Sequence, residues 1–230
     1  MASSTQHFTP GPGWLERHVP LNPPDSVGEE VASAVTHGLG AVASAIGLVL
    51  LIARASSQGT TTTVVGMTVF GLSMVLLYTA SCLYHSVRAP SAKRLCRVID
   101  HSSIYLLIAG TYTPVMLMLG GVWGWSIFGV VWTCAGLGIL LELFKMKKSK
   151  LASLAVYVAM GWVIILAWPP LQAVADPRLL HWMLAGGVTY TVGTLFYALK
   201  RLKYHHAIWH LFVLGGSAFF WIGIYAYCCG

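Results

Sequence analysis

Two histidines four residues apart, His206 and His210 in the stretch HAIWH, are the feature of this chain best suited to chemistry. On a helix this spacing places both imidazoles on one face about one turn apart, where they can bind a single metal ion. Such pairs also arise by chance, so the pair taken alone favours neither metal binding nor interior packing. Two further polar residues, His85 and Asp100, lie at the ends of other apolar runs. A metal site requires the fold to bring these stretches together.

The composition indicates which elements must position these residues. Hydrophobic residues make up 57% of the chain and charged residues only 9%, which is outside the range of a soluble globular domain. We therefore expect an integral membrane protein. Residues 1–28 are polar and rich in proline, without the apolar core of a signal peptide, and we predict a mobile tail there, followed by a transmembrane domain over residues 29–230.

Seven apolar runs are long enough to form transmembrane helices. They cover approximately residues 31–53, 62–85, 97–119, 122–144, 151–170, 179–199 and 205–227. Gly120 and Gly121 divide the third run from the fourth, and Pro169 and Pro170 are expected to end the fifth. Ser26 and the glutamate three residues later have the spacing of a capping box before the first run. The predicted fold class is all-α, a bundle of seven transmembrane helices.

The distribution of basic residues predicts the orientation of this bundle. Twelve of the fourteen Lys and Arg residues lie in the N-terminal tail and in the second, fourth and sixth connections, whereas Arg54 and Arg178 lie on the other side. The positive-inside rule then places the N-terminus in the cytoplasm and the C-terminus outside. The net charge of +7 is explained by this topology, so we expect no nucleic-acid partner. The twelve residues are Arg17, Arg88, Lys93, Arg94, Arg97, Lys145, Lys147, Lys148, Lys150, Lys200, Arg201 and Lys203.

With this orientation, the polar residues of several helices lie at one depth near the cytoplasmic side. The second helix ends there with His85, the third begins there with Asp100, and the seventh begins there with His206 and His210. Three imidazoles, with a fourth position left for water, match a catalytic zinc site. Zn²⁺ bound by these histidines would activate the water to attack a carbonyl, with Asp100 as the acceptor of its proton. A carboxylate in this environment also needs a partner, either the metal-bound water or a nearby His.

Other polar residues share the helix faces of these candidates. Ser81 lies four residues before His85, and Ser103 lies three residues after Asp100. We expect Ser81 to hydrogen-bond to Asp100, to the water or to a substrate oxygen, and Ser103 to support Asp100. Cys82 is an alternative zinc ligand, although a small residue in a helix is the more common interpretation.

Four blocks of the sequence resemble the hemolysin III family, the bacterial branch of the progestin and adipoQ receptor family. In chain order they are EEVASAVTHGLGA, SCLYHS, DHSSIYLLIAGTYTPV and HHAIWHLFVLGG. The resemblance implies a seven-helix bundle in the bacterial plasma membrane, with zinc bound near the cytoplasmic leaflet by the three histidines. It also implies a supporting role beside the ligands for His37, which lies in a Thr-His-Gly block.

The resemblance extends to function. Adiponectin receptors and alkaline ceramidases are similar in their zinc site, which implies that this chain hydrolyses the amide bond of a ceramide-like membrane lipid with a metal-bound water. A non-enzymatic, lipid-responsive protein of membrane homeostasis with structural zinc is the alternative. A pore-forming hemolysin is a third possibility, but the chain has no evident pore-forming segment. In each case the expected partner is membrane lipid.

Overall fold

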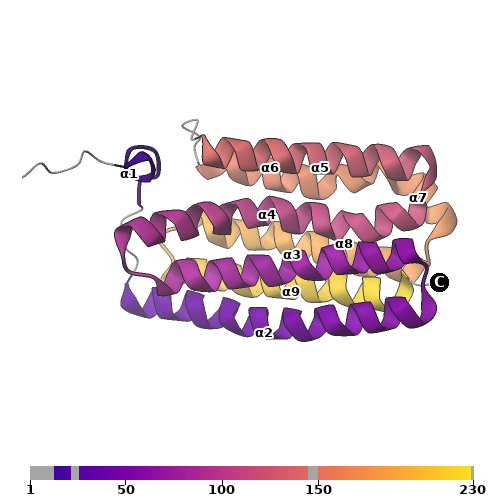
Figure 1. Ribbon diagram of the computed structural model, residues 1–230, viewed down its shortest axis with the longest axis horizontal. Helices are drawn as coiled ribbons and strands as arrows, with labels where there is room; N and C mark the ends of the chain where they lie inside the picture. The colour runs from indigo at the N-terminus through magenta and orange to yellow at the C-terminus, as the bar shows by residue number, and fades with distance from the viewer. Residues whose placement is uncertain (1–12, 22–25, 145–149, 229–230) are drawn as a thin grey trace, which may run out of the picture.

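A computed structural model describes residues 13–21, 26–144 and 150–228 (Figure 1). Residues 1–12 and 22–25 of the predicted tail, and Lys145, Lys147 and Lys148, lie outside the described residues. The described ranges contain helices and no strand, which confirms the all-α fold class. The elements are α1 (Trp14–His18), α2 (Val27–Gln58), α3 (Thr61–Ser86), α4 (Pro90–Leu119), α5 (Gly121–Leu143), α6 (Lys150–Trp162), the 3₁₀ helix η1 (Val163–Ala167), α7 (Trp168–Val174), α8 (Pro177–Ala198) and α9 (His205–Tyr227).

The long helices lie side by side and run alternately in opposite directions. Helix α2 packs on α3, α3 on α4, α4 on α5, and α8 on α9. In Figure 1, α5 and α6 form the upper layer and α2 lies at the bottom. Helix α9 returns to pack against α2. This contact brings the last helix of the chain, which carries His206 and His210, next to the first long one.

Six helical stretches are long and apolar enough to cross a membrane, in agreement with a multi-pass membrane protein. Helix α8 does not belong to this set. It nevertheless packs along α9. The count of seven spans and the orientation in the membrane stay predictions. The six stretches are Val27–Gln58, Thr61–Ser86, Pro90–Leu119, Gly121–Leu143, Ala152–Val174 and His205–Tyr227.

Two local signals in the sequence define helix ends as predicted. The Ser26 hydroxyl accepts from the Glu29 N–H at 3.3 Å, and the Glu29 carboxylate accepts from the Ser26 N–H at 3.0 Å, which confirms the capping box. Gly120 and Gly121 have φ values of +59° and +55°, which residues other than glycine rarely adopt. The chain therefore turns sharply between α4 and α5.

The prediction that Pro169 and Pro170 end the fifth helix is wrong. Both lie at the first positions of α7, where a proline ring fits the helical φ and its missing N–H is not needed. The interruption comes earlier, at η1. There the Tyr112 hydroxyl donates to the Gly161 carbonyl at 2.8 Å and accepts from the Ile164 N–H at 2.9 Å, so it satisfies backbone groups that the break leaves unpaired.

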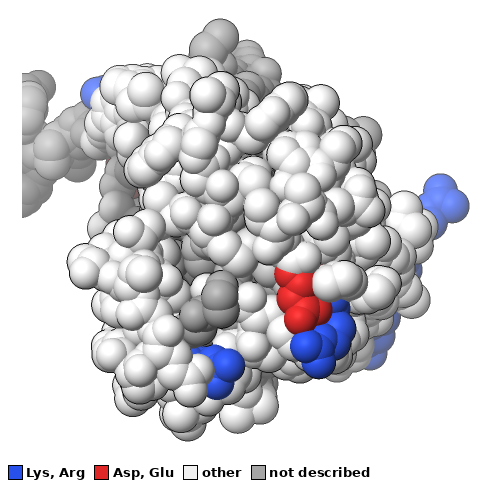
Figure 2. Space-filling model, turned by 90° about the vertical axis from the view of Figure 1, so that its right-hand side faces the viewer, with Lys and Arg blue, Asp and Glu red and all other residues white. Residues whose placement is uncertain are grey.

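The two ends of the bundle differ in charge. Figure 2 shows the end at which α9 finishes, where charged side chains are sparse. Asp176 and Arg178 pair there at 2.8 Å, and hydrogen bonds from Arg178 hold the pKa of the Asp176 carboxyl below its usual value. The basic residues of the second and sixth connections follow the ends of α3 and α8 at the opposite end. The orientation in the membrane, which was predicted from these same residues, stays a prediction.

Helices α3 and α4 approach each other closely at Gly66. A Cβ atom at this position would lie 2.8 Å from the Pro114 Cα and 3.3 Å from its nitrogen. We expect Gly66→Ala to destabilise the protein by about 1–3 kcal/mol, because backbone atoms must shift to relieve the overlap. Thermal unfolding in detergent, followed by intrinsic fluorescence, measures this effect. Gly129→Ala is the control, since nothing lies within 4 Å of a Cβ there. Equal unfolding temperatures for the two variants would contradict the prediction.

Candidate metal centre

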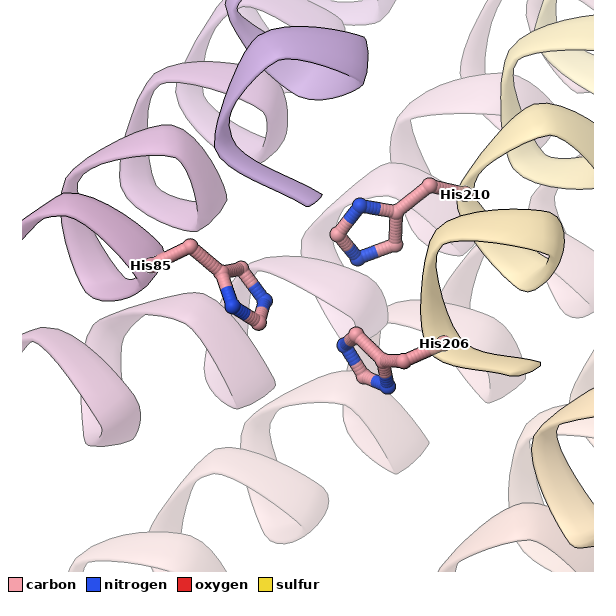
Figure 3. A group of neighbouring side chains, drawn as sticks. All are labelled: His85, His206 and His210. Atoms are coloured by element: carbon pink, nitrogen blue, oxygen red, sulfur yellow. The ribbon is translucent and has the colours of Figure 1, made fainter. Parts of the chain in front are cut away.

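Three histidines from two helices converge at the end of the bundle where α9 begins. His85 comes from the last turn of α3, and His206 and His210 come from the first turns of α9. One nitrogen from each ring lies within 4.8 Å of the other two. Figure 3 shows the three rings facing a common space between the helices. The structure thus brings together the three residues that the sequence predicts as metal ligands.

His85 is held in place by a residue of another helix. Its Nδ1 lies 2.8 Å from the Glu30 Oε2 atom, and the ring is almost completely buried. If Nδ1 carries the proton and donates to this carboxylate, Nε2 keeps its lone pair. Nε2 is buried and has no hydrogen-bond partner among the described residues. It is therefore available to a metal ion.

His210 is held in a similar way by α2. Its Nδ1 lies 3.2 Å from the Ser33 carbonyl oxygen and 3.3 Å from the Thr36 hydroxyl. If the carbonyl accepts the Nδ1 proton, Nε2 is again the nitrogen that is available to a metal ion. His37 stacks on the other side of the ring, with the two ring planes 9° apart and their centroids 3.5 Å apart. Helix α2 thus fixes both the position and the plane of His210.

The start of α9 is defined by Tyr204, which precedes the histidines and has a left-handed backbone with φ +59°. Its backbone N–H donates to the Glu29 Oε1 atom at 3.0 Å. Gly28 leaves room for this residue, since a Cβ there would lie 3.0 Å from the Tyr204 hydroxyl. Contacts with α2 therefore set the position at which α9 begins, and with it the position of His206.

The arrangement suits zinc. Histidine binds zinc at about 2.0–2.1 Å, so two nitrogens on one tetrahedral ion are roughly 3.4 Å apart. The three nitrogens, within 4.8 Å of one another, would need to approach by no more than roughly 1.4 Å, which side-chain rotation can supply. The buried Nε2 atom of His85, without a partner among the described residues, is the kind of orphan that a metal ion satisfies.

A cavity of about 670 Å³ lies beside the cluster. His206 and His210 line it together with His37, Ser81 and Asp100. The sequence also predicted four site residues that are not metal ligands, namely His37, Ser81, Asp100 and Ser103. The first three line the cavity, and Ser103 does not. The hydroxyl of Ser103 instead donates to a carbonyl of its own helix, at 2.7 Å. The chemical role of each residue stays a prediction.

Most of the cavity wall is apolar. Leu77, Ile104, Leu107, Ile108, Met183 and Phe220 contribute to it. The N-terminal segment contributes Glu16, Arg17 and His18, so residues of the predicted tail also border this space. A largely apolar cavity that also carries polar groups is typical of a binding site for a small amphipathic molecule.

Asp100 is buried and has a histidine partner. Its Oδ2 atom lies 3.3 Å from the Nδ1 of His101, the next residue in the chain. We expected this carboxylate to need a partner, and His101 is the histidine that lies beside it in the structure. Cys82, the alternative ligand, is not a member of the metal-binding group found among the described residues.

Sequence analysis did not identify Glu30, which contacts His85 in the structure. The spacing of Glu30, Ser33 and His37 places all three on one face of the first long helix. This spacing indicates a polar face directed into the bundle. It did not show that Glu30 would contact His85, because the contact depends on how α2 and α3 pack.

Comparisons with known proteins identify the family of this chain. The family model described as Haemolysin-III related matches residues 26–221. Hemolysin-3 of Bacillus cereus is 48% identical over 193 residues, which cover 84% of this chain and 88% of that protein. The Hemolysin-3 homolog of Bacillus subtilis (strain 168) is 44% identical over 204 residues, covering 88% of this chain and 96% of the relative. The human Monocyte to macrophage differentiation factor is 25% identical over 166 residues, covering 69% and 68%. The resemblance noted in the sequence is confirmed, and this chain belongs to the Haemolysin-III related family.

Proposed function

We propose that this protein is a zinc-dependent hydrolase that cleaves the amide bond of a membrane lipid. The observation that supports it most strongly is that His206 and His210 line the same cavity as Asp100 and Ser81. Three protein ligands with one open position are typical of catalytic zinc, whereas structural sites have four. The apolar walls provide a surface for an acyl chain, and the volume of about 670 Å³ is within the usual range of ligand sites.

The roles of the residues follow from their positions. Zinc held by the three histidines would supply Lewis-acid activation of the amide carbonyl and of a water molecule. The Asp100 carboxylate takes up the proton that the attacking water loses and passes it to the amine nitrogen as the C–N bond breaks. His101, 3.3 Å away, orients that carboxylate. The Ser81 hydroxyl donates a hydrogen bond to a substrate oxygen.

A non-enzymatic function is the second candidate. The backbones of α3 and α9 are not among the closely packed helix pairs of the described residues. Each of the two helices nevertheless contributes to the histidine cluster. A zinc ion there would join the two helices and stabilise the bundle. In this case the protein would act in membrane homeostasis and the cavity would bind lipid without cleaving it.

The first test is the metal itself. We expect one zinc ion per chain by elemental analysis of purified protein, and we expect a strong chelator to abolish the hydrolysis of an acyl-labelled ceramide in detergent micelles. Adding zinc back should restore turnover. Protein without stoichiometric zinc would contradict the proposal, whereas zinc without cleavage of any lipid amide, assayed by lipidomics of intact membranes, would favour the structural role.

A further inference from the structure

The His85 ring is linked to the protein surface through two charged side chains. Its Nδ1 lies 2.8 Å from Glu30 Oε2, and Glu30 Oε1 lies 2.8 Å from the Lys93 ammonium nitrogen. Exposure falls along this chain, from 18–19% for the side chains of Lys93 and Glu30 to 3% for His85. One carboxylate therefore contacts a candidate zinc ligand with one oxygen and a surface cation with the other.

The contact controls which nitrogen of His85 is free. A carboxylate accepts the Nδ1 proton, and the Lys93 ammonium donates to the other oxygen of the same carboxylate. Nε2 is then the unprotonated nitrogen, and it is the one that is buried without a partner among the described residues. Since α3 alone leaves the imidazole free to rotate about χ2, Glu30 also determines the direction in which Nε2 points.

The charge of the site gives a second reason for a carboxylate here. Three neutral imidazoles do not compensate a divalent cation, and an uncompensated buried charge is costly. Asp100 lies on the cavity side of the cluster and Glu30 lies on the α2 side. Together they place one carboxylate on each side of the cluster, and the Lys93 ammonium offsets part of the Glu30 charge. His85 is the only one of the three histidines with a carboxylate at hydrogen-bond distance in the described part of the chain.

We propose that Glu30 is a positioning residue of the metal centre, which fixes the tautomer and direction of His85 and strengthens its bond to zinc. This inference rests on the zinc site of the proposed function and adds to it a residue from α2 that binds no metal itself. Outer carboxylate partners of this kind typically contribute about 10–100-fold to metal affinity.

The test compares Glu30→Gln with Asp176→Asn, which makes the same acid-to-amide change at a residue that pairs with Arg178 and does not line the cavity. Zinc affinity is measured by competition with a chromogenic chelator. We expect Glu30→Gln to bind zinc about 10–100-fold more weakly and Asp176→Asn to bind it within about twofold of the parent protein. Equal affinity of Glu30→Gln and the parent protein would overturn the proposal.

A second measurement separates positioning from a general structural role. The side chain of Glu30 is partly accessible, so formate can enter the space left by Glu30→Ala. We expect formate, but not chloride at equal ionic strength, to restore zinc affinity and the visible spectrum of the Co²⁺-substituted protein. Failure of formate to restore either property in folded Glu30→Ala would contradict the proposal. If Glu30→Gln does not fold, Glu30→Asp serves instead, because its shorter carboxylate cannot reach His85 and affinity should fall by the same order.

The outcomes for the parent protein distinguish this inference from the proposed function. If the parent protein binds no zinc, both the positioning role of Glu30 and the proposed function are contradicted. If the parent protein binds zinc and its zinc affinity does not depend on Glu30, only the positioning role is contradicted. The proposed hydrolase function is then unaffected.

Discussion

The His206→Ala protein should contain no stoichiometric zinc and should hydrolyse no lipid amide. This change removes one of three ligands, and the two that remain, on α3 and α9, cannot complete a three-nitrogen site. The loss of affinity should therefore exceed the roughly 10–100-fold cost of losing an outer partner of a ligand. Elemental analysis of the purified protein measures zinc, and release of labelled fatty acid from ceramide measures turnover.

His181→Ala is the matched control for this experiment. His181 lies near the start of α8, is exposed and is not a member of the histidine cluster. It should retain one zinc per chain and full turnover. If His206→Ala also retains one zinc per chain, the cluster is not the zinc site. Lipidomics of membranes that contain the parent or the His206→Ala protein then identifies the lipid amides that accumulate when the site is lost.

The convergence of His85, His206 and His210 could be predicted because it depends on few assumptions. The i, i+4 spacing fixes the relation of His206 to His210 on any helix. The lengths of the apolar runs and the alternation of direction then place the end of one helix at the same depth as the start of another. Neither step requires the packing angle between helices. The structure accordingly shows the cluster where the sequence indicated it.

The residues that support the cluster could not be predicted in the same way. The hydrogen bond from His85 to Glu30 and the contact of Tyr204 with Glu29 join residues 55 and 175 positions apart. Both depend on the rotation of α2 about its axis and on its depth against α3 and α9. A polar helix face indicates that partners exist, but it does not identify them.

The N-terminal segment gives another example of contacts between distant residues. Val19 is buried, with an exposed fraction of 1%, and its carbonyl accepts from the Arg94 Nε at 3.0 Å. The Arg97 side chain similarly donates to the Pro20 carbonyl. Arg94 and Arg97 were interpreted from sequence mainly as topology signals. Their hydrogen bonds to this segment show that these basic residues also hold the neighbouring chain in place.

Asp100→Asn is the change that separates the two candidate functions. An amide cannot take up the proton of the attacking water, so we expect turnover to fall by about 10²–10⁴-fold, the usual contribution of a general base. Zinc content should remain at one ion per chain, because Asp100 is not one of the three clustered ligands. The fold should also survive, since Asn can still contact His101. Turnover of labelled ceramide and elemental analysis are measured on the same purified sample.

Asp176→Asn provides the control for this change. Asp176 caps the N-terminus of α8 and pairs with Arg178, away from the cavity, and Asn is an equally good cap. Its turnover and zinc content should match those of the parent protein. If zinc serves only to join α3 and α9, Asp100→Asn should instead leave every lipid assay unchanged while His206→Ala lowers the unfolding temperature. The pair of variants therefore assigns the zinc either to catalysis or to stability, because only a catalytic site requires a proton acceptor beside the three histidines.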